Sequence, residues 1–172
     1  MARISAVVAA AAVLTAAVVA QGAGAATGIS SSYAVSGIET SLPTNNTSTF
    51  AGAALGSGGD AARWRASVQH QALSNCPFGS GKSCAITGGT FSLSSLDGAH
   101  LAGAFVNGQG SVTPISQAPG CGKQVFGVRG ALATSAGPAV FAATLTHYRI
   151  PLFGTCIPYF ATITNGSLHL TA

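Results

Sequence analysis

Histidine, tyrosine and arginine stand together at residues 147–149, at the end of an apolar run, in a chain with only 6% charged residues. If this run is a strand, alternation places His147 and Arg149 on one face and Tyr148 on the other. An imidazole and a guanidinium at the mouth of a barrel would bind a carboxylate or another acidic group. The alternative is that both side chains reach water, or that Arg149 pairs with one of the few acids. We take His147, Tyr148 and Arg149 as candidate ligand-binding residues.

A second basic pair flanks the single tryptophan of the chain, in the string Arg63-Trp64-Arg65. Alternation in a strand places Trp64 on the inner face and both arginines on the outer face. A tryptophan in such a position is more often a core residue than a platform for a ligand. Two outward guanidinium groups would suit a polyanionic component of a cell envelope, so Arg63 and Arg65 are also candidate ligand-binding residues.

Acid–base catalysis has few carboxylates to use, because Glu39, Asp60 and Asp97 are the acidic residues of the chain. Glycoside hydrolysis needs two positioned carboxylates, yet Asp60 and Asp97 stand beside glycines, where aspartate commonly caps a turn. Glu39 precedes a polar segment, and we expect its side chain to be solvated. No G-x-S-x-G nucleophile motif occurs. A triad assembled from distant residues stays open, but the sequence identifies no catalytic residue.

Metal and phosphate-binding motifs are missing from the sequence. The histidines at 70, 100, 147 and 169 show none of the i, i+2 or i, i+4 spacings of a local metal pair. The string GSGKS at 79–83 lacks the glycine spacing of a phosphate-binding P-loop. We therefore expect no metal and no cofactor.

Four cysteines, Cys76, Cys84, Cys121 and Cys156, form an even set, which in an exported chain is typical of two disulfides. Three pairings are possible, and we favour Cys76–Cys84 and Cys121–Cys156. The first closes the short ring CPFGSGKSC, whose Pro and Gly residues suit a turn, and the second would join two strand segments. A zinc site is disfavoured because no C-x-x-C spacing occurs and export favours oxidation.

Residues 1–26 have the features of a secretory signal peptide. One arginine supplies the positive start, residues 4–20 are almost wholly apolar, and small residues follow, so we expect cleavage between Ala23 and Thr27. A membrane anchor is the alternative, although the apolar stretch is near the lower limit for spanning a bilayer. We expect residues 27–172 to form one all-β domain without a transmembrane span. The protein is then secreted or held in a cell envelope, and the composition of the signal suggests a bacterial source.

The charge pattern argues against a nucleic-acid partner. Without residues 1–26, six basic and three acidic residues leave a net charge of +3. The basic residues are scattered along the chain, whereas nucleic-acid binding proteins concentrate them in a stripe or patch. We therefore expect no binding of nucleic acid.

Short strands must position all these residues, because the chain after residue 26 alternates with period two and lacks helical periodicity. We predict an all-β fold, a single antiparallel β-barrel or sandwich of about 8–10 short strands stapled by two disulfides. Frequent Gly and Ala inside the strands favour a curved sheet and therefore a barrel. The expected strands are 32–38, 48–55, 62–73, 83–93, 100–106, 111–115, 124–133, 139–150, 157–164 and 167–171.

Two Asn-Gly pairs, Asn107-Gly108 and Asn165-Gly166, predict tight hairpins between neighbouring strands. Both residue types tolerate the positive φ that a two-residue turn needs. An outer-membrane barrel is a competing fold, but such barrels carry aromatic girdles at both interfaces. One Trp and three Tyr are too few for two girdles.

The function favoured by these patterns is a non-enzymatic binding module for a small, partly apolar ligand. His147 and Arg149 would be the polar anchors of a mostly apolar pocket. The expected partner is a small apolar or acidic ligand, or an envelope component. Two alternatives stay open: a small barrel enzyme, an isomerase or hydrolase using His147, Tyr148 or Arg149, and a surface module for protein–protein association whose low charge reflects exposed apolar strands.

Overall fold

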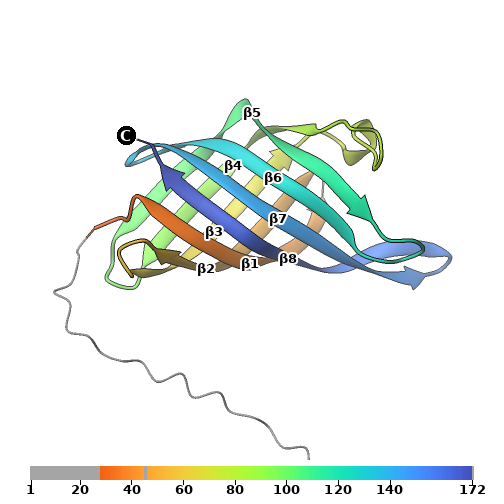
Figure 1. Ribbon diagram of the computed structural model, residues 1–172, viewed down its shortest axis with the longest axis horizontal. Helices are drawn as coiled ribbons and strands as arrows, with labels where there is room; N and C mark the ends of the chain where they lie inside the picture. Colours follow the sequence, from red (N-terminus) through yellow and green to blue (C-terminus); the bar gives the residue numbers. More distant parts are fainter. Residues whose placement is uncertain (1–27, 45, 172) are drawn as a thin grey trace, which may run out of the picture.

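Eight antiparallel strands close into a barrel in chain order, and the last strand pairs with the first (Figure 1). The computed structural model describes residues 28–44 and 46–171, so the predicted signal peptide at 1–26 lies outside the described residues. The all-β prediction is confirmed, and the fold is a closed barrel and not a sandwich. The elements are β1 (Ser32–Thr44), β2 (Thr47–Gly56), β3 (Ala61–His70), the 3-10 helix η1 (Leu73–Asn75), β4 (Cys84–Ser95), β5 (His100–Gln117), β6 (Gln124–Thr134), β7 (Gly137–Leu152) and β8 (Thr155–Leu170).

The two Asn-Gly pairs lie in β-bulges and not in hairpin turns, which corrects the prediction from sequence. Residues 106–109 of β5 stand opposite a single residue of β6, Ala131. In β8, Asn165 has a φ of 48°, and the registers with both neighbouring strands shift around it. A bulge uses the same positive φ as a tight turn. Two pairs of expected short strands therefore merge into two long ones, β5 and β8.

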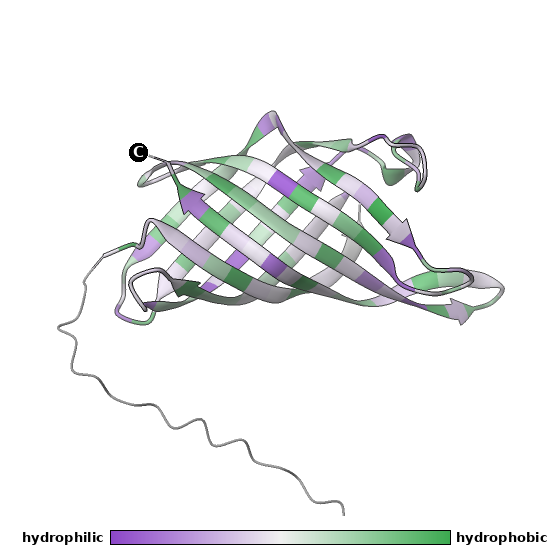
Figure 2. Cartoon of the chain, in the orientation of Figure 1, coloured by the Kyte–Doolittle hydropathy of each residue, from purple (hydrophilic) through white to green (hydrophobic). Residues whose placement is uncertain are grey.

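Alternation along the strands fills the barrel interior with apolar side chains, and Figure 2 shows hydrophobic residues interspersed with polar ones along the strands. Trp64 is 1% exposed, and its ring belongs to a central cluster whose neighbouring centroids lie 5.8–6.2 Å apart. Burial of such large aromatic surfaces is a dominant source of stability. The inside of the barrel is thus a packed core. The cluster contains Trp64, Phe91, Phe105 and Phe141.

A missing side chain at Gly37 makes room for the tryptophan. The indole Nε1 of Trp64 donates hydrogen bonds to the backbone oxygens of Ser36, at 2.9 Å, and of Ala53, at 3.1 Å. A Cβ atom at position 37 would lie 2.9 Å from the Trp64 ring and 2.4 Å from the backbone oxygen of Ala51. Glycine is required here because strand backbone and the indole ring both approach closely.

The two ends of the barrel are built differently, as the left and right sides of Figure 1 show. One end, here called the turn end, carries short turns and the start and finish of the described chain. The other, the loop end, carries longer connections and the tip of the β7–β8 hairpin. The turn end contains 57–60, 96–99 and 135–136, and the loop end contains 71–83, 118–123 and 153–154.

Polar contacts close the turn end. The hydroxyl of Ser30 donates to the Asp60 carboxylate, and the Ser30 N–H donates to the Tyr33 hydroxyl at 2.9 Å. Burial raises the pKa of Asp60, but hydrogen bonds from the hydroxyls of Ser30 and Tyr33 outweigh it, so this pKa lies below its ordinary value. A hydrogen bond from Ser95 likewise lowers the pKa of Asp97. Asp97 caps its turn, as predicted, by accepting a hydrogen bond from the Ala99 N–H at 3.1 Å, whereas the Asp60 carboxylate ties its turn to Ser30.

Both disulfides have the predicted connectivity. Cys76–Cys84 closes a ring in the connection between β3 and β4. Cys121–Cys156 joins the β5–β6 loop to the start of β8. Such bonds are typical of oxidising compartments. Within the described residues, no helix is long and apolar enough to cross a membrane.

Candidate functional site

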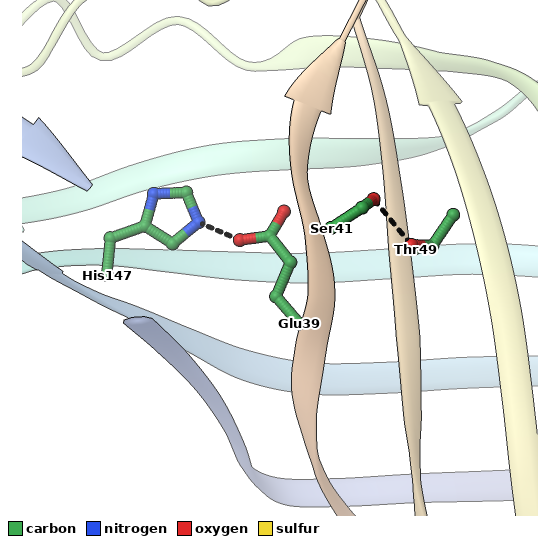
Figure 3. Close-up of polar contacts among 4 residues, drawn as sticks. All are labelled: Glu39, Ser41, Thr49 and His147. Atoms are coloured by element: carbon green, nitrogen blue, oxygen red, sulfur yellow. Dashed lines mark hydrogen bonds and ion pairs between the residues drawn. The ribbon is translucent and has the colours of Figure 1, made fainter. Parts of the chain in front are cut away.

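A carboxylate and an imidazole meet inside the loop end of the barrel, at Glu39 and His147 (Figure 3). Glu39 follows Tyr33 and Val35 on the inward-facing positions of β1, and His147 is inward on β7. Glu39 Oε2 lies 3.1 Å from His147 Nε2, and each side chain is 5% exposed. The atoms lie within ion-pair distance but are not aligned as a hydrogen bond. The expectation of a solvated Glu39 is therefore wrong.

The pair sits where the barrel seam opens. Strands β1 and β8 pair from Ser32↔His169 only as far as Ile38↔Thr162. Beyond this point β1 continues along β2, and β8 continues along β7. Glu39 is the first residue of β1 past the end of the shared ladder, so its side chain can reach across to β7. The loop end consequently has a gap in its main-chain hydrogen bonding between β1 and β8.

Two hollows flank the pair. Inside the barrel, His147 lines a cavity of about 20 Å³, which has room for about one water molecule. At the open seam, Glu39 lines a cleft of about 180 Å³. Each residue of the pair thus borders a different hollow. The other residues of the interior cavity are Ser48, Phe50, Val68, His70, Leu73, Val112, Phe126, Val128 and Leu145, and those of the seam cleft are Thr40, Ser41, Pro158, Tyr159, Phe160 and Ala161.

One oxygen of the Glu39 carboxylate has no donor. Oε1 is buried, and no residue within the described ranges gives it a hydrogen bond. The nearby hydroxyls bond to one another, with Ser41 Oγ 2.6 Å from Thr49 Oγ1 (Figure 3). Thr40 Oγ1 also lies 3.0 Å from Thr49 Oγ1. A buried carboxylate oxygen without a partner is costly, so Oε1 is the group of this site that most favours an incoming donor.

The connection between β3 and β4 covers the interior cavity. Leu73 lines the cavity, and the Phe78 ring packs 5.0 Å from the ring of Phe126. His70 is buried on the same wall, and its Nδ1 lies 2.7 Å from the backbone oxygen of Gln71. The Cys76–Cys84 disulfide closes this connection into a ring. The segment over the cavity is consequently braced by a covalent ring and is not a free loop.

The three predicted residues at 147–149 do not converge on one site. His147 faces Glu39, and its ring packs 5.3 Å from that of Phe126. Arg149 donates from Nε to the backbone oxygen of Gly122, at 2.9 Å, and from Nη2 to that of Gly120, at 3.0 Å. The guanidinium therefore holds the 118–123 loop.

Tyr148 belongs to the outer face of the hairpin. The Lys123 ammonium lies 5.0 Å from the centre of its ring, within cation–π distance. The ring of Phe160 packs 5.8 Å away. Tyr148 is thus separated by the sheet from the inward-facing His147.

The outward arginines of β3 also stand apart from the pair. Trp64 points inward and Arg63 and Arg65 outward, as the alternation predicts. Arg65 borders a hollow of about 520 Å³ on the outer surface of β1 to β4. Neither arginine forms an ion pair with any described residue. The hydroxyl residues that share this hollow are Thr40, Thr49, Ser67, Thr90 and Ser92.

The described part of the chain contains no set of metal ligands. No three His, Cys, Asp or Glu side chains lie close enough there to hold an ion. All four cysteines are in disulfides, and His100 and His169 are exposed on the outer surface. The site consists of one carboxylate–imidazole pair and the two hollows beside it.

Sequence reasoning missed Glu39 because its partner is far away in the chain. The available signal was the alternation from Tyr33 through Val35, which places residue 39 on the inner face. No local pattern shows that the β1–β8 ladder ends at Ile38. In comparisons with protein-family models, with curated proteins and with solved structures, none matches this chain.

Proposed function

We propose that this protein binds a small, partly apolar ligand in the seam cleft between β1 and β8, with Glu39 as the polar anchor. The observation that carries the proposal is the buried Glu39 carboxylate. Its Oε2 lies 3.1 Å from His147 Nε2, and its Oε1 receives no hydrogen bond from any described residue. Small-molecule sites combine apolar walls with a few placed polar groups. The seam cleft has an apolar side, formed by Pro158, Tyr159, Phe160 and Ala161, and a polar side, formed by Glu39, Thr40 and Ser41.

The anchor defines the chemistry of the ligand. A carboxylate oxygen accepts hydrogen bonds, so the ligand should present an N–H or O–H group, with an amine the strongest case. The acidic ligand expected from Arg149 loses its support, because two backbone oxygens already occupy that guanidinium. The cleft of about 180 Å³ is smaller than the pockets of about 300 Å³ and above that hold drug-sized molecules. We therefore expect a compact amine or alcohol with an apolar body.

We propose that the protein acts outside the cytoplasm. Two disulfides suit an oxidising compartment, and residues 1–26 carry the pattern of a secretory signal. The protein would be exported, lose this segment, and act as a secreted or envelope-associated binding module. N-terminal sequencing of the protein purified from its host tests the cleavage.

Fragment screening tests the ligand class. Ligand-observed NMR on the purified protein should select small apolar amines and alcohols over matched carboxylic acids. Chemical-shift changes should centre on Glu39, Tyr159 and Phe160. The variant Glu39→Gln keeps the shape but removes the charge, and it should weaken an amine ligand roughly ten-fold. Asp97→Asn removes the same charge at the turn end and should leave affinity unchanged.

Two results would contradict the proposal. One is a set of ligands whose shift changes map to the outer surface at Arg65 and not to the seam. The other is equal affinity in Glu39→Gln and the unmodified protein. Native mass spectrometry of material purified from the host adds an independent readout, since a co-purifying small molecule should leave when Glu39 is replaced.

An enzyme is the second candidate, because a carboxylate beside an imidazole is the arrangement that orients a general base. Ser48 lines the same interior cavity as His147. Binding is preferred over catalysis because that cavity has room for about one water molecule and the Glu39–His147 contact is not aligned as a hydrogen bond. Turnover of small esters that is lost in both His147→Gln and Ser48→Ala would favour the enzyme instead.

A further inference from the structure

We propose that the loop end docks onto an anionic lipid surface, with the exposed tip of the β7–β8 hairpin entering the interface. The hairpin tip is defined as residues 150–157. Its exposed apolar side chains are Ile150, Leu152 and Phe153, and Phe153 is 95% exposed. This inference uses a different surface from the seam cleft and does not depend on the ligand proposed there.

Apolar exposure is concentrated at this hairpin. Of the nine large hydrophobic residues exposed in the described part of the chain, three lie at the hairpin tip, and the next two along β8, Tyr159 and Phe160, belong to the seam cleft. Figure 1 shows the hairpin projecting past the body of the barrel at the loop end. Exposed apolar groups gathered at one projecting point are typical of interaction sites, whereas scattered ones are ordinary.

The turn at the tip makes Phe153 an unexpected choice for folding alone. Phe153 has a φ of 49° and Gly154 a φ of 78°, which is the pattern of a two-residue turn that favours Asn-Gly. A bulky aromatic residue is disfavoured in this backbone region. The fold therefore gains nothing from phenylalanine here, because its ring is also left in water. An apolar environment outside the protein would remove the exposed Phe153 ring from water.

The charged residues at the loop end indicate which kind of apolar environment the tip would bind. The basic residues Lys82, Lys123 and Arg149 belong to the loop end. The aspartates Asp60 and Asp97 lie in the connections at the opposite end. Glu39 is the acidic residue nearest the loop end, and it is buried against His147. Lys123 and Arg149 lie beside the base of this hairpin, and Lys82 adds a positive charge elsewhere at the loop end. An apolar tip on a cationic end of the barrel is complementary to a bilayer with anionic headgroups.

A disulfide and two hydrogen bonds connect the hairpin to a neighbouring loop. The Cys121–Cys156 disulfide ties it to the 118–123 loop, and Arg149 donates to two oxygens of the same loop. Lys123 of this loop sits over the Tyr148 ring. The apolar tip and a cation are thereby presented together, which lowers the entropy lost on binding.

Vesicle sedimentation of the purified protein tests the proposal. Vesicles of equal parts phosphatidylglycerol and phosphatidylcholine should bind the protein, and vesicles of phosphatidylcholine alone should bind it much less. Added salt should weaken the interaction. Phe153→Asn should reduce binding roughly ten-fold, and Lys82→Ala and Lys123→Ala should each reduce it roughly five-fold.

The choice of asparagine separates binding from folding. Phe153→Asn places a favoured residue in the turn, so the melting temperature should stay the same or rise while vesicle binding falls. Leu96→Asn is the matched control, because Leu96 is 73% exposed at the turn end, and it should bind as the unmodified protein does.

Equal binding to neutral and anionic vesicles, no binding to either, or equal losses in Phe153→Asn and Leu96→Asn would overturn the proposal. So would a stable dimer, detected by sedimentation equilibrium, that Phe153→Asn dissolves in the absence of lipid, since the tip would then serve a second copy of the chain.

Discussion

Glu39 Oε2 and His147 Nε2 lie 3.1 Å apart where β1 and β8 stop pairing. Their contact joins β1 to β7 at a level of the barrel where the ladder between β1 and β8 is missing. The pair therefore has a structural consequence that does not depend on any ligand. It links the two sides of an open seam, and it explains how a charged side chain is tolerated at an inward position.

Breaking the pair from one side should destabilise the barrel. In Glu39→Ala the imidazole loses its buried partner, and we expect the free energy of unfolding to fall by about 1–3 kcal/mol. The double variant Glu39→Met with His147→Phe leaves no unpaired group and should lose less than the sum of its single variants. Urea denaturation followed by the fluorescence of Trp64 measures the unmodified protein and the four variants, and strictly additive losses in the double variant would show that the contact contributes nothing.

We expect Arg149 to stabilise the 118–123 loop through its two hydrogen bonds. Arg149→Lys keeps the charge but loses the fork that donates to Gly120 and Gly122, so we expect a loss of about 1–2 kcal/mol. Hydrogen exchange should accelerate at the Ala118 amide, which donates to the Lys123 oxygen at 2.8 Å. Arg129→Lys on the outer face of β6 is the control and should leave both readouts unchanged. An unaltered Ala118 amide in Arg149→Lys would contradict this role.

Acid should weaken the turn end through Asp60. Its pKa is lower in the folded protein than in the unfolded chain, so its contribution is complete above the unfolded pKa of about 3.9 and is lost as the pH falls through the folded value. Asp60→Asn should therefore flatten the decline in stability below about pH 4. Melting temperatures across this range provide the measurement. A slope remains in the variant because the pKa of Asp97 is lowered too.

Gly37 should not tolerate even one added carbon. In Gly37→Ala the new Cβ would meet the Ala51 backbone oxygen and the Trp64 ring, and we expect a loss of about 1–3 kcal/mol from overpacking. Gly127→Ala is a control in the barrel wall, since its Cβ would first meet a side-chain atom of Ile115 at an ordinary 3.4 Å. Equal thermal stability of the two variants would rule out the steric explanation.

The disulfide at the loop end should stabilise the fold mainly through the unfolded chain. Cys121 and Cys156 are 35 residues apart, and closing a loop of that length is worth about 4 kcal/mol in the loop-entropy model. Replacing both by alanine should lower the urea midpoint while β-sheet circular dichroism is retained. A thiol assay on the denatured, unreduced protein should detect no free thiol, and any reactive cysteine would contradict the assigned pairing.

The candidate site was only partly accessible to prediction. Alternation placed Trp64 inside and its flanking arginines outside correctly, because period two is a local property of strands. The same rule put His147 inside but grouped it with Arg149, whereas the register between β7 and β8 shifts between Tyr148 and Arg149. Such a shift depends on the partner strand, and no local pattern in β7 reveals it.

Local chemistry in the sequence by itself determined that the chain forms strands, that its cysteines pair in two rings, and that each Asn-Gly pair places one residue, Gly108 or Asn165, at positive φ. Only the tertiary structure decided that those pairs are bulges, that eight strands close into a ring, and that the β1–β8 ladder ends at Ile38. The physical reason is the range of the interactions. Residue type controls the backbone of its own segment, but barrel closure brings together residues such as Glu39 and His147, which are more than a hundred positions apart in the chain.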